Sequence, residues 1–367
     1  MKKLFAIMLL LPVLLACNNK NYDSIVEYFK TNQQLTHKVF DLQDAAEELL
    51  DPHSIVVSGN TMTTWNLRSP YLFTTIDIAS KRVIKHWGTR GQGPNEFYGS
   101  TVDMYVNYLE SGLNIWDCLY GKLWFFPNSN LESDSTYFQQ IPTGFTNTKT
   151  STPMTYSDFA ISSIQIDTSI FVILGGGNDK LFTLFNLKSN EEKEFGDFPP
   201  EDMNTQIPAG VRKRAYWGKV RYNSSLKKLV HMVVTSEMFT IYNIKGTNVE
   251  LVMGNYTTIP KYREVQMSLG PSIIMEYVGN GNGRNQSLTV SDKNIFILYQ
   301  EYKRVGMEKP TDSNLTADLV LVFDWDGNPV KLYTLDCFVT DINYDKGTNR
   351  LYAIHNNPYP EIIYFEL

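Results

Sequence analysis

The chain has 367 residues, a formal net charge of −6 and 43% hydrophobic residues, so it is long enough to bury a large core. The mild acidity argues against a nucleic-acid-binding protein, which needs a basic face. An aromatic content of 13%, with 22 Tyr and 20 Phe, favours strands over helices.

The N-terminus has the composition of a targeting segment. Two lysines precede an apolar run over residues 4–15, which is short for a membrane span of about 20 residues. The sequence Leu14-Leu15-Ala16-Cys17 resembles the lipobox of bacterial lipoproteins. The resemblance implies a signal peptide over 1–17, lipidation of Cys17 and an address in the bacterial cell envelope, at the outer membrane on its periplasmic or surface face. An ordinary secretory signal and a membrane helix are the alternatives.

Residues 18–52 lie between the targeting segment and the repeated strands, and they divide into three short parts. Residues 18–35 are polar and predict a tether between the membrane and the folded domain, which we place at 36–367. Residues 37–42 predict an isolated strand. Residues 44–50 have apolar positions at helical spacing, and the following Asp51-Pro52 would end a short helix there.

From His53 onward the chain repeats one pattern, in which short strands are followed by a turn-rich link. Asp326-Gly327 between two apolar runs is a strong hairpin signal, and no long helical period interrupts the strands. The pattern predicts six units with the length of propeller blades, which span residues 54–87, 101–141, 161–195, 219–253, 287–335 and 338–367.

The number of strands predicts how the ring closes. The sixth unit has only three strands before the chain ends, whereas the strand at 37–42 has no blade of its own. If that strand is the outer strand of unit six, six blades are complete and one sheet edge is covered. The sequence therefore predicts an all-β fold, a six-bladed β-propeller closed by an N-terminal strand. A pair of β-sandwiches is the rival fold.

Two cysteines remain beyond Cys17, and they could form a disulfide in an oxidising compartment. Cys118 falls in unit two and Cys337 at the end of unit five, on opposite sides of a six-membered ring. A disulfide needs Cα atoms within about 7 Å, so we expect two free thiols.

Residues 88–97 combine three glycines and a proline between two strands. Such a segment cannot lie inside a helix or a central strand, and it predicts a shaped link between units one and two. We expect Phe97 to fill the space between two blades. A nucleotide-binding role lacks the expected Gly-Lys-Ser/Thr and following helix.

This link, together with the lipobox, resembles the TolB-like six-bladed propeller lipoproteins and is similar to the link of NHL-repeat propellers. The motif is Gly88-x-x-Gly91-x-Gly93-Pro94-x-Glu96-Phe97. The resemblance covers about residues 36–367 in architecture, and it implies binding in the cell envelope without naming an activity.

In a propeller, two sets of loops lie on the same face of the ring. One set connects the fourth strand of a blade to the first strand of the next blade, and the other connects strands two and three within a blade. We expect a ligand-binding funnel on that face, because arginines can hold carboxylate or sulfate and a tryptophan can stack on a sugar. The alternative is that these are ordinary solvated loop residues. The candidate residues are Arg68, Arg90, Asp117, Arg214, Trp217, Arg263 and His355.

Catalytic and metal motifs are weak. The five histidines show no metal-binding spacing, and no G-x-S-x-G is present. Four aspartates near the ends of inner strands could converge and bind Ca²⁺, or they could cap strand ends. They are Asp117, Asp167, Asp292 and Asp341.

We therefore expect a lipid-anchored envelope protein that binds a protein partner or a glycan-like ligand without catalysis and without a cofactor. The alternative is a hydrolase or lyase with an acidic, Ca²⁺-binding central channel.

Overall fold

The computed structural model describes residues 24–43, 49–91, 93, 96–97, 102–107, 112–118, 121–132, 139–141, 160–175, 179–255, 258–268, 270–276, 283–302, 316–356 and 359–367. Cys17, the expected lipidation site, lies outside these residues, and so does most of the expected helix at 44–50. Within the described part of the chain, no helix is both long and apolar enough to cross a membrane.

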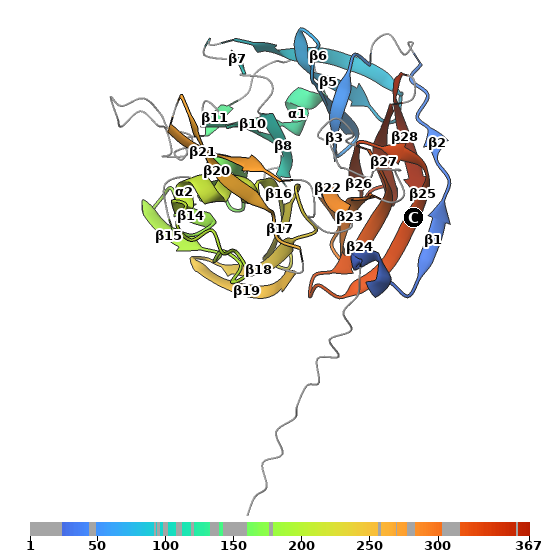
Figure 1. Ribbon diagram of the computed structural model, residues 1–367. Helices are drawn as coiled ribbons and strands as arrows, with labels where there is room; N and C mark the ends of the chain where they lie inside the picture. The colour runs from blue at the N-terminus through green and yellow to red at the C-terminus, as the bar shows by residue number, and fades with distance from the viewer. Residues whose placement is uncertain are drawn as a thin grey trace, which may run out of the picture.

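Six antiparallel sheets surround a central axis, which confirms the predicted six-bladed propeller (Figure 1). The first strand of each blade is the innermost one. Blades one to three consist of β3 (Pro52–Ser58), β4 (Thr61–Asn66), β5 (Tyr71–Asp77), β6 (Arg82–Arg90) and β7 (Glu96–Phe97); β8 (Val102–Asn107), β9 (Gly112–Asp117), β10 (Lys122–Pro127) and β11 (Gln139–Ile141); and β12 (Ala160–Gln165), β13 (Ile170–Gly175), β14 (Phe182–Asn186) and β15 (Glu191–Phe195).

Blades four to six follow the same order. They consist of β16 (Gly218–Asn223), β17 (Lys228–Val233), β18 (Phe239–Lys245) and β19 (Asn248–Asn255); β22 (Gly283–Val290), β23 (Asn294–Glu301), β24 (Ala317–Asp324) and β25 (Pro329–Val339); and β26 (Asp341–Asp345), β27 (Arg350–Asn356) and β28 (Pro360–Glu366).

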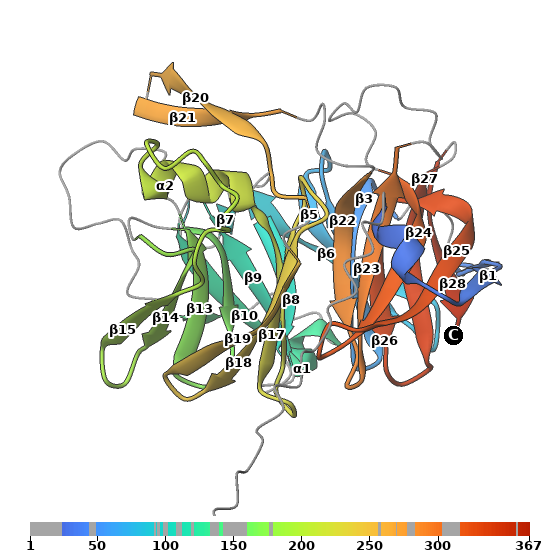
Figure 2. The ribbon, with the colours of Figure 1, turned by 60° about the horizontal axis from the view of Figure 1, so that its bottom comes forward.

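Few elements lie outside the blades. The short helix α1 (Asn128–Leu131) lies on one face of the ring, and α2 (Ala209–Arg212) with the 3₁₀ turn η5 (Lys213–Tyr216) lies on the other (Figure 2). Between blades four and five, β20 (Tyr262–Met267) and β21 (Gly270–Met275) form a hairpin above α2. We call these two faces the α1 face and the hairpin face.

The N-terminal segment closes the ring as predicted, and it also adds a strand to blade five, which was not predicted. In β2 (Lys38–Val39), Lys38 pairs with Tyr364 of β28, so β2 completes blade six. In β1 (Asn32–Leu35), Asn32 pairs with Leu332 of β25, so β1 adds a fifth, parallel strand to blade five. We call residues 24–40 the N-terminal strap.

The predicted tether is wrong for residues 24–35, which pack onto the propeller. Ile25, at the start of η1 (Ile25–Tyr28), is 5% exposed, and Leu35 is 4% exposed. The side chains at 32–34 remain exposed because β1 is an edge strand that pairs through its backbone. Polar composition therefore does not distinguish this strand from a tether.

The core lies between neighbouring blades, and aromatic pairs connect them. Trp87 of blade one stacks on Phe126 of blade two with ring centroids 4.3 Å apart. Phe239 of blade four and Phe323 of blade five lie 4.7 Å apart. Such pairs stabilise the packing beyond their buried area, and they fix each blade against the next.

The link between blades one and two has the predicted structural role. Gly88 has a φ of +74°, and a Cβ there would lie 2.6 Å from the ring of Phe73. Phe97 is fully buried, with its ring 5.4 Å from that of Phe73 in blade one and 5.8 Å from that of Trp124 in blade two. Phe97 therefore fills the space between the two blades.

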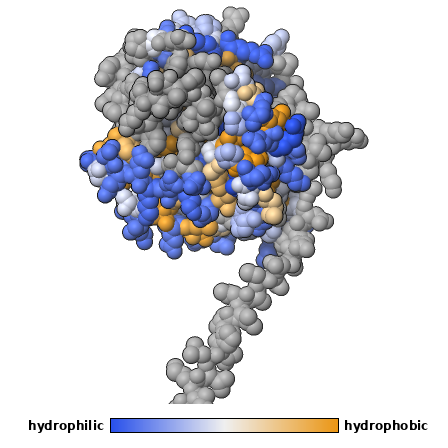
Figure 3. Space-filling view, turned by 60° about the vertical axis from the view of Figure 1, so that its left-hand side comes forward, coloured by the Kyte–Doolittle hydropathy of each residue, from blue (hydrophilic) through white to orange (hydrophobic). Residues whose placement is uncertain are grey.

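Hydrophilic side chains cover most of the described surface on the side seen in Figure 3, and hydrophobic ones form small patches. Neither Cys118 nor Cys337 forms a disulfide, as predicted.

Candidate functional site

The two predicted funnel residues of blade one differ in their roles. Arg68 has an exposed side chain. Arg90 donates hydrogen bonds to the carbonyl oxygens of Asn66 (3.1 Å), Leu67 and Ser69 (3.4 Å). The guanidinium of Arg90 thus fixes the loop between β4 and β5, so its role in the structure is to stabilise that loop.

The other predicted funnel residues lie in different surroundings. Asp117 is fully buried, whereas Trp217 and Arg263 are exposed on the hairpin face and Arg214 is half-buried. His355 contacts the carbonyl oxygen of Phe338 at 2.7 Å and stacks on His37 of the strap, toward the outside of the ring. His355 is therefore away from the central axis.

The four aspartates that could either converge on Ca²⁺ or cap strand ends lie in separate places. Asp341 pairs with Lys219 near the axis, Asp292 pairs with Lys346 at the α1 face, and Asp167 is exposed in the turn between β12 and β13. Among the described residues they do not form a group that could share one metal ion. The strand ends carry these side chains to opposite faces of the ring, so the four do not gather around one ion as the Ca²⁺ alternative would require.

On the hairpin face, a buried carboxylate ties the hairpin to the link before blade four. Asp202 accepts hydrogen bonds from Arg212 (2.9 Å), Tyr216 (2.8 Å) and Tyr262 (2.6 Å), and Tyr262 belongs to β20. Burial alone would raise the pKa of Asp202, but these donors lower it below its ordinary value. The hairpin is thus part of the packed structure.

Charged and hydroxyl side chains meet around the axis. Asp341 of β26 accepts hydrogen bonds from Lys219 of β16 (2.8 Å), from Ser54 of β3 (2.8 Å), from Ser287 of β22 and from the Ile55 amide (2.9 Å). Four of the six inner strands therefore meet at one carboxylate. Asp341 is 3% exposed, and Lys219 compensates its charge.

A second acid lies close to the same lysine. Asp103 of β8 accepts a hydrogen bond from Tyr105 (3.2 Å), and the guanidinium of Arg221 lies over the Tyr105 ring at 4.9 Å. Burial raises the pKa of Asp103, although Lys219 and Arg221 oppose that shift. We call this set of side chains the axial network. Its members are Asp341, Lys219, Ser54, Ser287, Asp103, Tyr105 and Arg221.

A cavity of about 470 Å³ opens at the α1 face, below the axial network. We call it the mouth cavity. Its walls are the turns between the first and second strands of blades one, four, five and six, together with α1. The lining residues are Val57, Ser58, Gly59, Asn128, Tyr222, Asn223, Ser224, Ser225, Val290, Ser291, Asp292, Tyr344, Asp345, Lys346 and Gly347.

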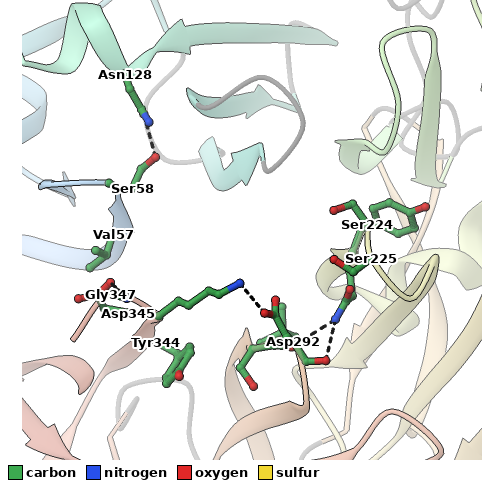
Figure 4. A pocket seen from close by; sticks show the side chains of 15 residues that line it. Val57, Ser58, Asn128, Ser224, Ser225, Asp292, Tyr344, Asp345 and Gly347 are labelled. Carbon is green, nitrogen blue, oxygen red and sulfur yellow. Dashed lines mark hydrogen bonds and ion pairs between the residues drawn. The ribbon is translucent and has the colours of Figure 1, made fainter. Parts of the chain in front are cut away.

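Hydrogen bonds hold these walls together (Figure 4). Ser58 donates to Asn128 at 2.8 Å, and Asn223 donates to the carbonyl oxygens of Ser291 (3.3 Å) and Asp292 (3.2 Å). Ser224 and Ser225 stand on the side opposite Ser58. The cavity is therefore built by groups from several blades and lies within the usual size range of small-molecule sites.

The two carboxylates in the cavity are already engaged. Asp345 accepts hydrogen bonds from the amides of Gly347 (2.9 Å) and Thr348 (3.2 Å), and Asp292 forms an ion pair with Lys346. The rest of the lining is neutral, with serine hydroxyls, asparagine amides and tyrosine rings that a ligand would meet.

The sequence contains a weak signal for this site. Asp345-Lys346-Gly347 reads as a turn, and Ser224-Ser225 and Asp292-Lys293 have similar polar composition. Turn composition alone does not tell which turns meet around one cavity, because that depends on ring closure.

Comparison with known proteins agrees with this architecture. The family model described as TolB-like 6-blade propeller-like matches residues 29–347. The chain belongs to this family. No curated protein is similar enough in sequence to count as a relative of this TolB-like propeller.

Solved structures resemble this TolB-like propeller at low sequence identity. A Bacteroides fragilis protein described as a candidate exported protein is 10% identical with a TM-score of 0.53, and the match covers 91% of this chain and 99% of that one. A Bacteroides vulgatus member of the DUF4221 family is 13% identical with a TM-score of 0.48, over 86% of this chain and 94% of that one. At such identities the likeness concerns the fold alone.

Proposed function

We propose that this TolB-like propeller is a lipid-anchored protein of the bacterial cell envelope that binds a sugar or short glycan in the mouth cavity without converting it. The mouth cavity carries the proposal, because turns from four blades and α1 bring hydroxyl and amide groups to one cavity that opens at the α1 face. Hydroxyl-rich ligands need many such donors and acceptors placed in fixed directions.

The charges of the cavity favour a neutral ligand. The charged lining residues are Asp292, Asp345 and Lys346, and the lysine is paired with Asp292. An anionic ligand would meet no unpaired cation among these residues and would be repelled by Asp345. The rings of Tyr222 and Tyr344 provide apolar surface for the C–H faces of a sugar.

Binding fits this cavity better than glycoside hydrolysis does. Hydrolysis needs one carboxyl group as acid and another as base or nucleophile, both free to meet the substrate. Here Asp345 is held by its own turn and Asp292 by Lys346. A partner protein that carries a glycan would bind in the same way.

Ligand binding can be measured by isothermal titration with neutral oligosaccharides and with sulfated or phosphorylated versions of them. We expect neutral sugars to bind more tightly than the anionic forms. Ser225→Trp would fill the cavity from an exposed position and should weaken binding at least about tenfold, a change of about 1.4 kcal/mol.

The control for this experiment is Arg68→Ala, because Arg68 is exposed at the opposite end of blade one, in the loop between β4 and β5. Its affinity should stay within about twofold of the parent protein, a difference below about 0.5 kcal/mol. Loss of binding in Arg68→Ala with retention in Ser225→Trp would move the site to the hairpin face. Absence of sugar binding by the parent protein would exclude this class of ligand.

The membrane anchor is proposed from the lipobox and is supported by the description of the similar Bacteroides fragilis protein as exported. We expect Cys17→Ser to abolish incorporation of a labelled fatty acid into the protein, because the thiol of Cys17 is the proposed acylation site. Metabolic labelling followed by capture with an antibody against the propeller measures this. Undiminished labelling of Cys17→Ser would contradict lipid anchoring at Cys17.

A further inference from the structure

Three side chains with metal-binding chemistry meet where the N-terminal strap crosses blade five. They are His37 of the strap and Asp336 and Cys337 of β25, and one ligand atom of each lies within 4.8 Å of those of the other two. This group lies at the perimeter of the ring, separate from both the axial network and the mouth cavity.

The backbone fixes these residues in place. Leu35 of β1 pairs with Leu335 of β25, so the strap enters the group two residues later in a set register. The His37 amide donates to both carboxylate oxygens of Asp336, at 3.1 and 3.3 Å, and Nδ1 of His37 lies 2.9 Å from Oδ1 of Asp336. The three groups are thus held together by strand pairing and hydrogen bonds.

A second histidine lies beside this group with one ring nitrogen already oriented. Nδ1 of His355 lies 2.7 Å from the carbonyl oxygen of Phe338, and a carbonyl can only accept, so Nδ1 carries the proton. The other ring nitrogen, Nε2, lies 3.8 Å from Oε1 of Glu361. The His37 and His355 rings stack with centroids 6.2 Å apart. Histidines that bind metals are usually oriented by such a carbonyl.

We propose that His37, Asp336 and Cys337 bind a zinc ion, with the imidazole of His355 stacked on that of His37 beside the site. A mixed set of nitrogen, oxygen and sulfur donors at this spacing suits Zn²⁺, which accepts all three in tetrahedral geometry. The hard cations Ca²⁺ and Mg²⁺ prefer oxygen donors alone. When the zinc–sulfur bond forms, the thiol of Cys337 loses its proton to solvent.

The ion would join the strap to the propeller. His37 lies between β1, which belongs to blade five, and β2, which belongs to blade six. A zinc ion bound only in the folded state would therefore stabilise the closure of the ring.

Cobalt is a suitable probe, because Co²⁺ occupies zinc sites and a cobalt–thiolate bond gives a charge-transfer absorption. The full-length protein, stripped of metal, is titrated with Co²⁺ and then with Zn²⁺. We expect a charge-transfer band that saturates at one Co²⁺ per chain and disappears when Zn²⁺ displaces the cobalt. A protein that shows no band and no Zn²⁺ binding would overturn the proposal.

Matched variants locate the ligands. Cys337→Ser should abolish the band, and His37→Ala should weaken Co²⁺ binding more than about tenfold. Cys118→Ser is the control, because it removes the second partly buried thiol of the described residues and should leave the titration unchanged. Equal loss in Cys118→Ser and Cys337→Ser, or a full band in Cys337→Ser, would exclude this site.

A measurement on the unmodified protein avoids the risk that a variant does not fold. Zn²⁺ should slow alkylation of Cys337 by iodoacetamide while leaving that of Cys118 unchanged, as followed by peptide mass spectrometry. Equal rates at Cys337 with and without Zn²⁺ would contradict metal binding by this thiol.

Discussion

Asp341→Ala is expected to lower the free energy of unfolding by about 3–5 kcal/mol, because it removes the carboxylate that is hydrogen-bonded to the mostly buried Lys219. The side chain of Lys219 is 20% exposed and that of Asp341 is 4% exposed. The substitution also removes the acceptor used by Ser54, Ser287 and the Ile55 amide. Urea unfolding followed by tryptophan fluorescence measures the effect.

The effect should depend on pH with a definite sign. Burial alone would raise the pKa of Asp341, but Lys219, Ser287 and the Ile55 amide lower it below its ordinary value. The unfolded state then binds the proton at a higher pH than the folded state, so the stabilisation is complete above about pH 4. It is lost as the pH falls toward the folded-state pKa, and the difference between the parent protein and Asp341→Ala should shrink there.

The control for this prediction is Asp326→Ala. Asp326 pairs with Lys228 at 2.6 Å, but its side chain is 71% exposed. Solvent screens this pair, and we expect a loss below about 1 kcal/mol. Similar losses in the two variants would show that the axial network does not hold the inner strands together.

Phe97→Ala is expected to cost about 3–5 kcal/mol, the usual range when a fully buried aromatic ring is removed and the cavity does not collapse. Phe97 has no exposed surface, and it contacts Phe73 and Trp124 from two different blades. The two sheets cannot move together to fill the space, because Trp87 and Phe126 already stack between them. Chemical denaturation at neutral pH measures the loss.

Tyr359→Ala is the matched control, since it also removes an aromatic ring but from a residue that is 79% exposed. We expect it to change stability by less than about 0.5 kcal/mol. A loss below about 1 kcal/mol in Phe97→Ala would mean that the link is a mere connection and not a packing element.

The sequence predicted one packing element of the fold, but it did not predict where the candidate binding cavity lies. The role of Phe97 followed from a glycine-rich link between two strands, because few structures tolerate that composition. The usual loop geometry of propellers predicted a ligand-binding funnel on the hairpin face. In the structure, Arg90 of that predicted funnel holds a loop, and the mouth cavity opens on the α1 face. Loop polarity is common to both faces, so it could not choose between them.

The sequence by itself determined the six blades and the closing N-terminal strand, because strand and turn signals are local and their number leaves one blade incomplete. Only the tertiary structure decided that β1 joins blade five, that Asp341 meets Ser54 across 287 positions in the chain, and that His37 meets Asp336 across 299. These contacts depend on strand register and on closure of the ring. A shift of one residue in register turns every side chain of a strand to its other face. Local composition does not encode that choice, so the axial network, the mouth cavity and the proposed zinc ligands become visible only in the folded ring.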